Sequence, residues 1–373
     1  MQVSGSARFL TVIVFILVVF GLIMLSSAGV VEGQKKFGSP YYYFTHQLLY
    51  GVLPGIVVFL LFSRINYKIW RKIALPLLIA AVGLLVLVFI PGVGYGLKGA
   101  QRWINFKFFT FQPSEFLKFA LIVYLAAWFG RKEGNTNSLA GQAGRSSGGS
   151  YSVAPFFLIL FFVGLLLILQ PDMGTLAIVT LIAVAMYFFA GAKLSHFISM
   201  ILVFAILLGA LSWIVPYRFD RIRSFLNPAT DKQGTSYHIN QALLGIGSGG
   251  IFGLGFGQSR QKLNYLPEPV ADSIFAVVIE ELGFVGGVAL ISLFSLLAFS
   301  MVSIAKATSS QFCRLLVLGI MIWISAQALI NISAISGLIP LTGIPLPFIS
   351  FGSSALVAIM AGLGIVVNIA KYS

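Results

Sequence analysis

The sequence predicts an all-α polytopic membrane protein with about ten transmembrane helices, and two features of its composition support this fold class. Of the 373 residues, 58% are hydrophobic and only 9% are charged. Soluble globular domains carry about 25% charged residues, so this chain lies far outside their range. Its apolar residues also form repeated runs of about 20, the length that a helix needs to cross the hydrocarbon core of a bilayer.

The apolar runs follow one another along the whole chain, which predicts a single membrane domain over residues 1–373. The first run has a core of residues 9–25, longer than the roughly 7–15 apolar residues of a secretory signal, so we expect a retained first helix. About ten crossings return both termini to the same side. The expected helices cover residues 9–28, 44–63, 73–90, 114–129, 154–170, 172–190, 194–215, 272–304, 313–337 and 345–370.

The short turn "RINYKIWRK", residues 64–72, decides the expected orientation. It holds four cations and no acid between the second and third runs, as short cytoplasmic loops do. Counted over the whole chain, the Lys and Arg residues are divided evenly between the two sides, so this short loop carries the argument. We therefore expect both termini in the cytoplasm.

Two segments are too long to be simple connections. Residues 130–152 are rich in Gly, Ser and Asn and predict a flexible cytoplasmic loop. Residues 216–271 lie between the seventh and eighth runs and mix aromatic with turn residues. Because long loops in compact domains usually have a function, we expect this extracytoplasmic loop to fold on the outer surface and carry one.

The outer segments are strongly basic. Residues 91–113 and 216–271 carry nine Lys and Arg against three Asp and Glu, in a chain of net charge +14. Such a surface favours an anionic ligand, such as a phospholipid head group or a lipid-linked phosphate; the alternative is that these are solvated loop charges. No soluble basic domain with interleaved aromatic residues is evident, so nucleic acid is not an expected partner.

The glycine-rich stretch "GIGSGGIFGLGFG", residues 245–257, belongs to the same outer loop. It contains seven glycines, but no strand precedes it, so it does not fit a nucleotide-binding fingerprint. We expect a close backbone approach or irregular backbone that lines a cavity.

Three carboxylates at residues 272–281 are the first candidates for chemistry, because an ionised acid in the hydrocarbon region costs at least about 2.5–3.5 kcal/mol. Asp272 lies where the outer loop meets the apolar run, and its place at a helix start also suits an N-cap. Glu280 lies about 12 Å deeper along a helix, too far to pair directly with Asp272. Glu280 and Glu281 favour a supporting role, as buried hydrogen-bonding groups.

Two further clusters carry charge near the membrane boundary. In "QRWINFKFFTFQPSEFLKFA", residues 101–120, Glu115 falls in the first turn of an expected helix, and it shares a helical face with Lys118. This pair is either structural or positions neighbouring cations. In "LQPDMGT", residues 169–175, Asp172 lies in a tight polar hairpin, and we expect it to be structural.

The Cys and His residues give no metal or disulfide pattern. Cys313 is the single cysteine, and the three histidines are scattered at residues 46, 196 and 238. No spacing typical of a zinc site is present, and no internal disulfide can form.

The chain resembles the SEDS family (shape, elongation, division and sporulation), which includes FtsW, RodA and SpoVE. The residues that carry the resemblance include "QRWINFKFFTFQPSEFLKFA", "LQPDMGTLAIV" and "IPLTGIPLPFISFGSSALVAIMAGLGIVVNI". A longer match runs from "YHINQALLGIGSGG" through "QSRQKLNYLPEPVADSIF" to "EELGF", and its middle part is most similar to the FtsW/SpoVE branch.

The resemblance implies a peptidoglycan glycosyltransferase of the bacterial cytoplasmic membrane, which polymerises lipid II for septal or elongation wall synthesis. It implies a class B penicillin-binding protein as transpeptidase partner, together with other divisome or elongasome membrane proteins. Asp272 matches the family's essential aspartate, and Glu115 with Lys118 matches its ion pair. Around Asp272 the chain departs from the family, since "VADSIF" stands where "HTDFIF" is common and "ISFGSSAL" stands where "ISYGGSS" is usual.

Together these observations predict a mechanism. Asp272 accepts the proton of the acceptor hydroxyl as general base, and the undecaprenyl diphosphate leaves with inversion at the anomeric carbon. Cations offset its growing charge, and a divalent cation such as Mg or Mn is a further candidate without a recognisable cage. The expected substrate-binding residues are Arg102, Lys107, Glu115, Lys118, Arg260 and Lys262.

Two other functions fit the same composition. A lipid II flippase also needs polar residues inside a helical bundle, although transporter sites usually lie at the bilayer midplane. A scaffold that only recruits the transpeptidase would not need the carboxylate of Asp272.

Overall fold

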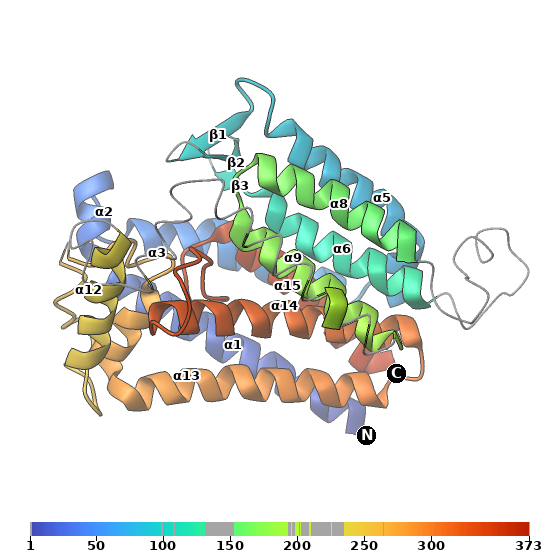
Figure 1. Cartoon of the computed structure of the whole chain (residues 1–373). Helices are drawn as coiled ribbons and strands as arrows, with labels where there is room; N and C mark the ends of the chain where they lie inside the picture. The colour runs from blue at the N-terminus through green and yellow to red at the C-terminus, as the bar shows by residue number, and fades with distance from the viewer. Residues whose placement is uncertain are drawn as a thin grey trace, which may run out of the picture.

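The computed structural model describes residues 2–97, 100–106, 109–130, 153–192, 235–263 and 265–372, together with residues 195, 198–200, 202, 209 and 225. Within this part of the chain, six helices are long and apolar enough to cross a membrane, and two shorter apolar helices accompany them. The helices lie side by side as a bundle (Figure 1). The predicted fold class, an all-α polytopic membrane protein, is confirmed.

The first quarter of the chain is helical apart from short turns. The first expected run becomes the long helix α1, and the second is built from three helical pieces that form one continuous span, Tyr42–Phe62. The middle piece is π-helical, with hydrogen bonds between residues five apart. The elements are α1 (Gln2–Ala28), α2 (Val30–Phe37), α3 (Tyr42–Gln47), the π-helix η1 (Leu48–Val52), α4 (Leu53–Phe62) and α5 (Tyr67–Leu87).

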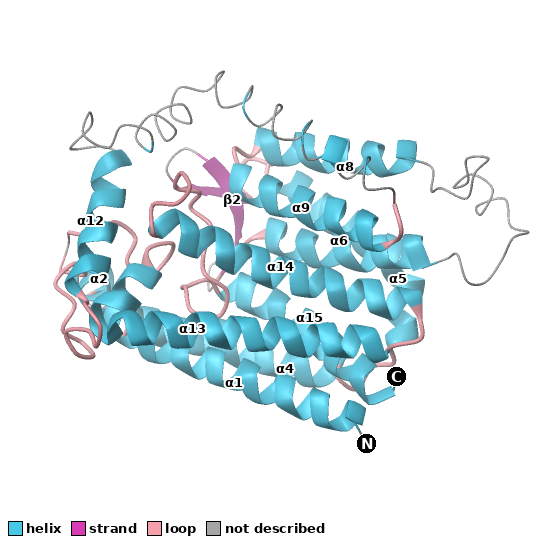
Figure 2. Ribbon diagram, turned by 60° about the horizontal axis from the view of Figure 1, so that its bottom comes forward, coloured by secondary structure: helices cyan, strands magenta, loops and turns pink. Residues whose placement is uncertain are grey.

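A small antiparallel sheet follows α5, where the sequence predicted only a basic loop. Its strands are β1 (Gly94–Leu97), β2 (Ala100–Asn105) and β3 (Thr110–Phe111), in the order β1, β2, β3. Gly94 pairs with Ile104, and Ile104 with Phe111. Figure 2 shows this sheet beside the ends of the helices, where it leads directly into α6.

The middle of the chain supplies α6 (Pro113–Phe129), α8 (Val153–Leu169), α9 (Met173–Phe189) and α12 (Thr235–Ser248). The predicted cytoplasmic loop lies, after Gly130, outside the described residues. The expected helix over residues 194–215 and the first part of the outer loop, residues 216–234, also lie outside them, apart from a few isolated positions.

The run predicted at 272–304 is α13 (Ile274–Ala307), and it is not one straight helix. Gly283 has φ 70° and ψ −171°, so the helix breaks there into a short first segment and a long second one. Only glycine adopts such a backbone without strain. The break places Glu280 and Glu281 at the end of the short segment.

The last two helices are α14 (Gln311–Ile335) and α15 (Ser353–Tyr372). The expected helix at 345–370 therefore starts too early, because Pro345 and Pro347 cannot continue a helix, and residues 336–352 form an irregular loop. In α15, 78% of its most apolar stretch of 18 residues is buried inside the protein, against 28% of the corresponding stretch in α5. The centre of the bundle is thus α15, and α5 lies at its rim.

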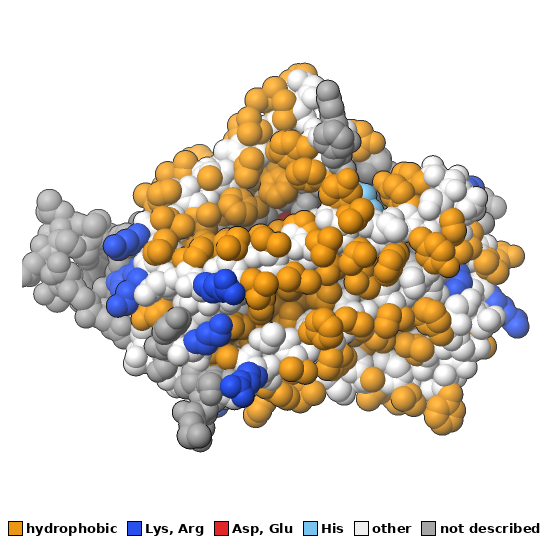
Figure 3. All heavy atoms as spheres, turned by 180° about the vertical axis from the view of Figure 1, so that it is seen from behind, with side chains coloured by type: hydrophobic (Ala, Val, Ile, Leu, Met, Phe, Trp, Pro, Cys, Tyr) orange, Lys and Arg blue, Asp and Glu red, His pale blue; other side chains and the backbone are white. Residues whose placement is uncertain are grey.

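The two ends of the bundle differ in charge. Both termini lie at one end, here called the terminal end (Figure 1). None of the described Asp and Glu residues lies at this end. Helix ends and turns place eight cations there: Arg8, Arg64, Lys68, Arg71, Lys72, Lys306, Arg314 and Lys371. The space-filling view shows Lys and Arg toward the ends and a hydrophobic belt between them (Figure 3).

Candidate functional site

Asp272 lies at the opposite end of the bundle, here called the site end, and is partly exposed. The N-cap of α13 is Ser273, so the expected N-cap role of Asp272 is wrong by one residue. Its main chain is held from two other elements. Asn331 of α14 donates to its carbonyl at 2.8 Å, and Ser350 donates to the neighbouring carbonyl of Ala271 at 2.5 Å.

The loop that supplies Ser350 is itself fixed against α14. The side-chain amide of Asn331 donates a second bond to Ile344 at 2.7 Å. Four residues further along the loop, Phe348 has φ 66°, and Phe351 donates its N–H to the carbonyl of Val270 at 2.8 Å. The residues before Asp272 are therefore clamped between α14 and the 336–352 loop.

Glu115 and Lys118 form a buried ion pair of 2.8 Å, which confirms the predicted pairing on one face of α6. The two residues are 3% and 2% exposed. Lys118 also donates to Gln327 at 3.0 Å and lies over the ring of Trp323, 5.2 Å from its centroid. An ammonium so enclosed cannot reach a ligand without a rearrangement.

Gln327 connects this ion pair to the site loop. Its amide nitrogen donates to the carbonyl of Pro345 at 3.0 Å, next to the carbonyl that Asn331 holds. Polar contacts thus run from Lys118 through Gln327, the 344–345 backbone and Asn331 to Asp272. Because buried polar groups held in a network have few alternative partners, this arrangement is rigid.

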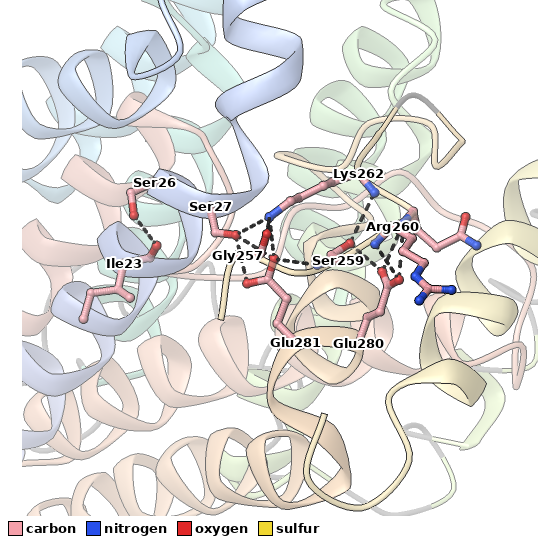
Figure 4. A network of polar contacts seen from close by, with 10 residues as sticks. Ile23, Ser26, Ser27, Gly257, Ser259, Arg260, Lys262, Glu280 and Glu281 are labelled. Carbon is pink, nitrogen blue, oxygen red and sulfur yellow. Dashed lines mark hydrogen bonds and ion pairs between the residues drawn. The ribbon is translucent and has the colours of Figure 1, made fainter. Parts of the chain in front are cut away.

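Glu281, at the break in α13, binds side chains from two distant parts of the chain (Figure 4). Lys262 contacts its carboxylate at 2.8 Å, and Ser27 of α1 donates to it at 2.6 Å. Lys262 donates further bonds to Ser27 and to the carbonyl of Gly257. Glu281 is 0% exposed and Lys262 is 7% exposed, so this ion pair lies inside the protein.

Glu280 holds the adjoining part of the same loop (Figure 4). Its carboxylate accepts from the Ser259 hydroxyl at 2.5 Å and from the Arg260 N–H at 2.8 Å. Gln261 adds a third donor at 3.3 Å. Arg260 contributes its main chain to this contact, and the residue is exposed.

The glycine-rich loop also pairs with the broken backbone of α13. Leu254 and Gly255 donate to the carbonyls of Glu280 and Glu281 at 2.9 and 3.0 Å, and Phe284 donates to Gly250 at 2.9 Å. These are backbone groups that the break removes from the helix, and in a bilayer each must find a partner. A side chain at Gly253 or Gly283 would collide with the facing backbone, which explains the close approach expected from the glycines.

Arg102 and Asp172 meet at the turn between α8 and α9. Arg102 donates to the carbonyl of Gln170 at 3.1 Å and to that of Pro171, and one of its nitrogens lies 3.9 Å from Asp172. Asp172 is the N-cap of α9 and accepts from Thr175. Ser114, at the start of α6, donates to Asp172 at 3.4 Å, so this turn joins three elements.

The structure changes the roles expected for several cations. Lys118 and Lys262 were expected among the substrate-binding cations that offset the diphosphate charge, and in the structure both are buried in ion pairs with carboxylates. Arg260 is exposed, the Arg102 side chain is 31% exposed, and Lys107 lies outside the described residues. Sequence reasoning missed Gln327, Asn331 and Ser350, although polar side chains in apolar runs were an available signal.

No group of three or more His, Cys, Asp or Glu side chains that could hold a metal ion occurs in the described part of the chain. The residues around Asp272 are mainly amide, hydroxyl and apolar groups, which do not form a cage for Mg or Mn. We therefore assign no step to a metal.

Comparison with known proteins gives matches along almost the whole chain. A family model described as "Cell cycle protein", which covers FtsW, RodA and SpoVE, matches residues 7–373. The chain is 38% identical over 364 residues to the stage V sporulation protein E of Bacillus subtilis, with 98% of this chain and 96% of the relative covered. It is 38% identical over 360 residues to a probable peptidoglycan glycosyltransferase FtsW of Trichlorobacter lovleyi, with 96% and 92% covered.

Solved structures share the fold. A chain of the structure reported under the words "Structural coordination of polymerization and crosslinking by a peptidoglycan synthase complex" superposes with a TM-score of 0.78 at 26% identity, covering 97% of both chains. The rod shape determining protein RodA of Thermus thermophilus superposes with a TM-score of 0.69 at 26% identity, covering 97% of this chain and 95% of RodA.

Proposed function

Because this chain belongs to the SEDS family of FtsW, RodA and SpoVE proteins, we propose that it polymerises lipid II into glycan strands at the outer face of the cytoplasmic membrane. The chain is a multi-pass membrane protein, and its family acts in cell-wall synthesis. The proposal adds the substrate, the reaction and the orientation. Septal and elongation synthesis fit it equally well.

The observation that carries the proposal is the way in which Asp272 is presented. Its main chain is fixed by Asn331 and, through Ala271, by Ser350, while the residue itself stays partly exposed. Glu115, Glu280 and Glu281, by contrast, are buried and engaged with the protein. A general base must be held firmly and still reach its proton.

In the proposed reaction, a hydroxyl oxygen of the acceptor sugar forms a bond to the anomeric carbon of the donor. The bond from that carbon to the diphosphate breaks, the hydroxyl proton passes to Asp272, and undecaprenyl diphosphate leaves as an anion. Displacement without a covalent sugar intermediate inverts the anomeric carbon. Arg260, which is exposed at the site end, is a candidate cation to offset the diphosphate charge, together with Arg102 and Lys107.

The charge asymmetry of the bundle supports the proposed orientation. The terminal end carries cations without described acids, as cytoplasmic surfaces do, so the site end faces outward. A class B penicillin-binding protein is the proposed partner, since one structural relative comes from a peptidoglycan synthase complex. Chelation tests whether the reaction needs a divalent cation bound to the diphosphate.

The test is to purify the chain with its cognate class B partner, reconstitute it in vesicles with lipid II, and measure both glycan strands and movement of lipid II between leaflets. We expect the wild-type complex to make glycan strands. A parallel reaction with EDTA measures whether strand synthesis needs a divalent cation. Lipid II movement without strands would replace the polymerase by a flippase. If neither is seen while the partner still crosslinks supplied strands, the chain is a scaffold.

A further inference from the structure

A hydrogen bond from α12 reaches the residue next to Asp272. The imidazole Nε2 of His238 lies 2.5 Å from the hydroxyl oxygen of Ser273. Ser273 is 0% exposed, so this contact is inside the protein. Neither residue has a part in the reaction described above.

The contact replaces the usual role of a serine at this position. A serine N-cap normally accepts from an N–H in the first helical turn, but Ser273 makes no side-chain cap bond within α13. Its hydroxyl is committed to His238 instead. The start of α13 is therefore held from α12 by a side chain.

Three consecutive residues are thus anchored to three different elements. Ala271 is held by Ser350 of the 336–352 loop, Asp272 by Asn331 of α14, and Ser273 by His238 of α12. The first two contacts fix carbonyl oxygens before the helix. The third contact, between His238 and Ser273, holds the N-cap residue of α13 itself.

We propose that His238 is a positioning residue for the glycosyl transfer: through Ser273 it fixes the start of α13, so that Asp272 is held in reach of the acceptor hydroxyl. This inference rests on the proposed function and assigns His238 no contact with substrate. A displacement of about 1 Å at a reacting group costs on the order of 100-fold in rate. The loss should appear in kcat, because lipid II binding does not depend on this bond.

The experiment compares His238→Ala, Ser273→Ala, the double variant and His238→Gln in the purified complex with its class B partner and lipid II. We expect each single alanine variant to lower kcat about 10- to 100-fold with KM within about twofold. The double variant should be no worse than either single one, and His238→Gln, whose amide can still bond to Ser273, should recover part of kcat. Asn240→Ala on the same helix is the matched control, expected to keep wild-type kcat.

Hydrogen exchange at residues 270–276 provides a readout that needs no activity. Exchange there should rise in His238→Ala and Ser273→Ala and return toward wild type in His238→Gln. Unchanged exchange, or strictly additive losses of kcat, overturns the inference. If Asp272→Asn stays active, the proposed base is wrong; if it is inactive while the His238 and Ser273 variants behave as wild type, only the positioning role fails.

Discussion

Asn331 donates both hydrogens of its side-chain amide to main-chain carbonyls, one of Asp272 at 2.8 Å and one of Ile344 at 2.7 Å. One residue, 1% exposed, therefore joins the candidate base to the loop that covers it. It lies in the apolar helix α14, where a polar side chain is costly unless it is used.

Replacing Asn331 by Ala should lower the polymerisation rate by about tenfold or more. The buried carbonyl of Ile344 would lose its donor, at a cost of about 1–3 kcal/mol, and the partly buried carbonyl of Asp272 would lose the bond that holds its backbone. Steady-state rates with lipid II test this, and Ser325→Ala on the same helix is the control. A variant of Asn331 with the wild-type rate would show that the clamp is not needed.

The Glu115 and Lys118 pair should behave as a buried ion pair in unfolding. Lys118→Met alone should cost about 3–5 kcal/mol because it strands a buried carboxylate, whereas Lys118→Met with Glu115→Gln should recover much of the loss. The midpoint of thermal unfolding in detergent measures this.

Lys36 with Glu32 is the matched control, because it is an ion pair one helical turn apart whose lysine side chain is 53% exposed. Lys36→Met should cost less than about 1 kcal/mol. Equal losses at the two pairs would contradict the buried role of Lys118.

Loss of the Lys262 ammonium should release the loop that it anchors. In Lys262→Met, Glu281 keeps Ser27 but loses its cation, and Gly257 loses a donor. Hydrogen exchange at residues 253–262 should therefore become faster.

Arg260→Ala serves as the control for this measurement, because Arg260 binds Glu280 through its main-chain N–H, which the substitution retains. Slow exchange in both variants would mean that Lys262 is dispensable for the loop.

Gly283→Ala should prevent normal folding. Its φ of 70° is strained for any other residue, and a Cβ there meets the backbone of Ile251 and Gly253. The yield of monodisperse protein in detergent tests this. Gly257→Ala separates the two causes, since Gly257 has φ 78° but open space around its Cβ position; its yield should fall much less.

Much of the bundle was predictable from the sequence, and the exceptions have physical reasons. Apolar runs of membrane-spanning length identified the helices around α1, α6 and α14, and the i, i+3 spacing identified the Glu115 and Lys118 pair. The strands at 94–111 were missed because the basic residues of that segment suggested only a surface loop. The break at Gly283 was missed because a glycine is tolerated in an apolar helix, and Gly286 and Gly287, which follow it, remain helical.

The site depends more on contacts between distant segments. Lys262 looked like a free outer cation, and only the fold brings Ser27 and Glu281 to it. The last predicted helix began too early, because Pro345 and Pro347 belong to the irregular loop before α15. That loop supplies the carbonyls that Gln327 and Asn331 hold. Asp272 was a candidate from the sequence because it lies at the boundary between a polar loop and an apolar run, and its catalytic role stays a prediction.

The most direct test of the central claim is the rate of lipid II polymerisation by the purified complex with Asp272→Asn, compared with Glu268→Gln as a control in the same loop. Asparagine keeps the size of the side chain and removes the proton acceptor. The account predicts a loss of about 100- to 10,000-fold for Asp272→Asn, with Glu268→Gln close to wild type. Wild-type strand synthesis by a folded Asp272→Asn complex would contradict it.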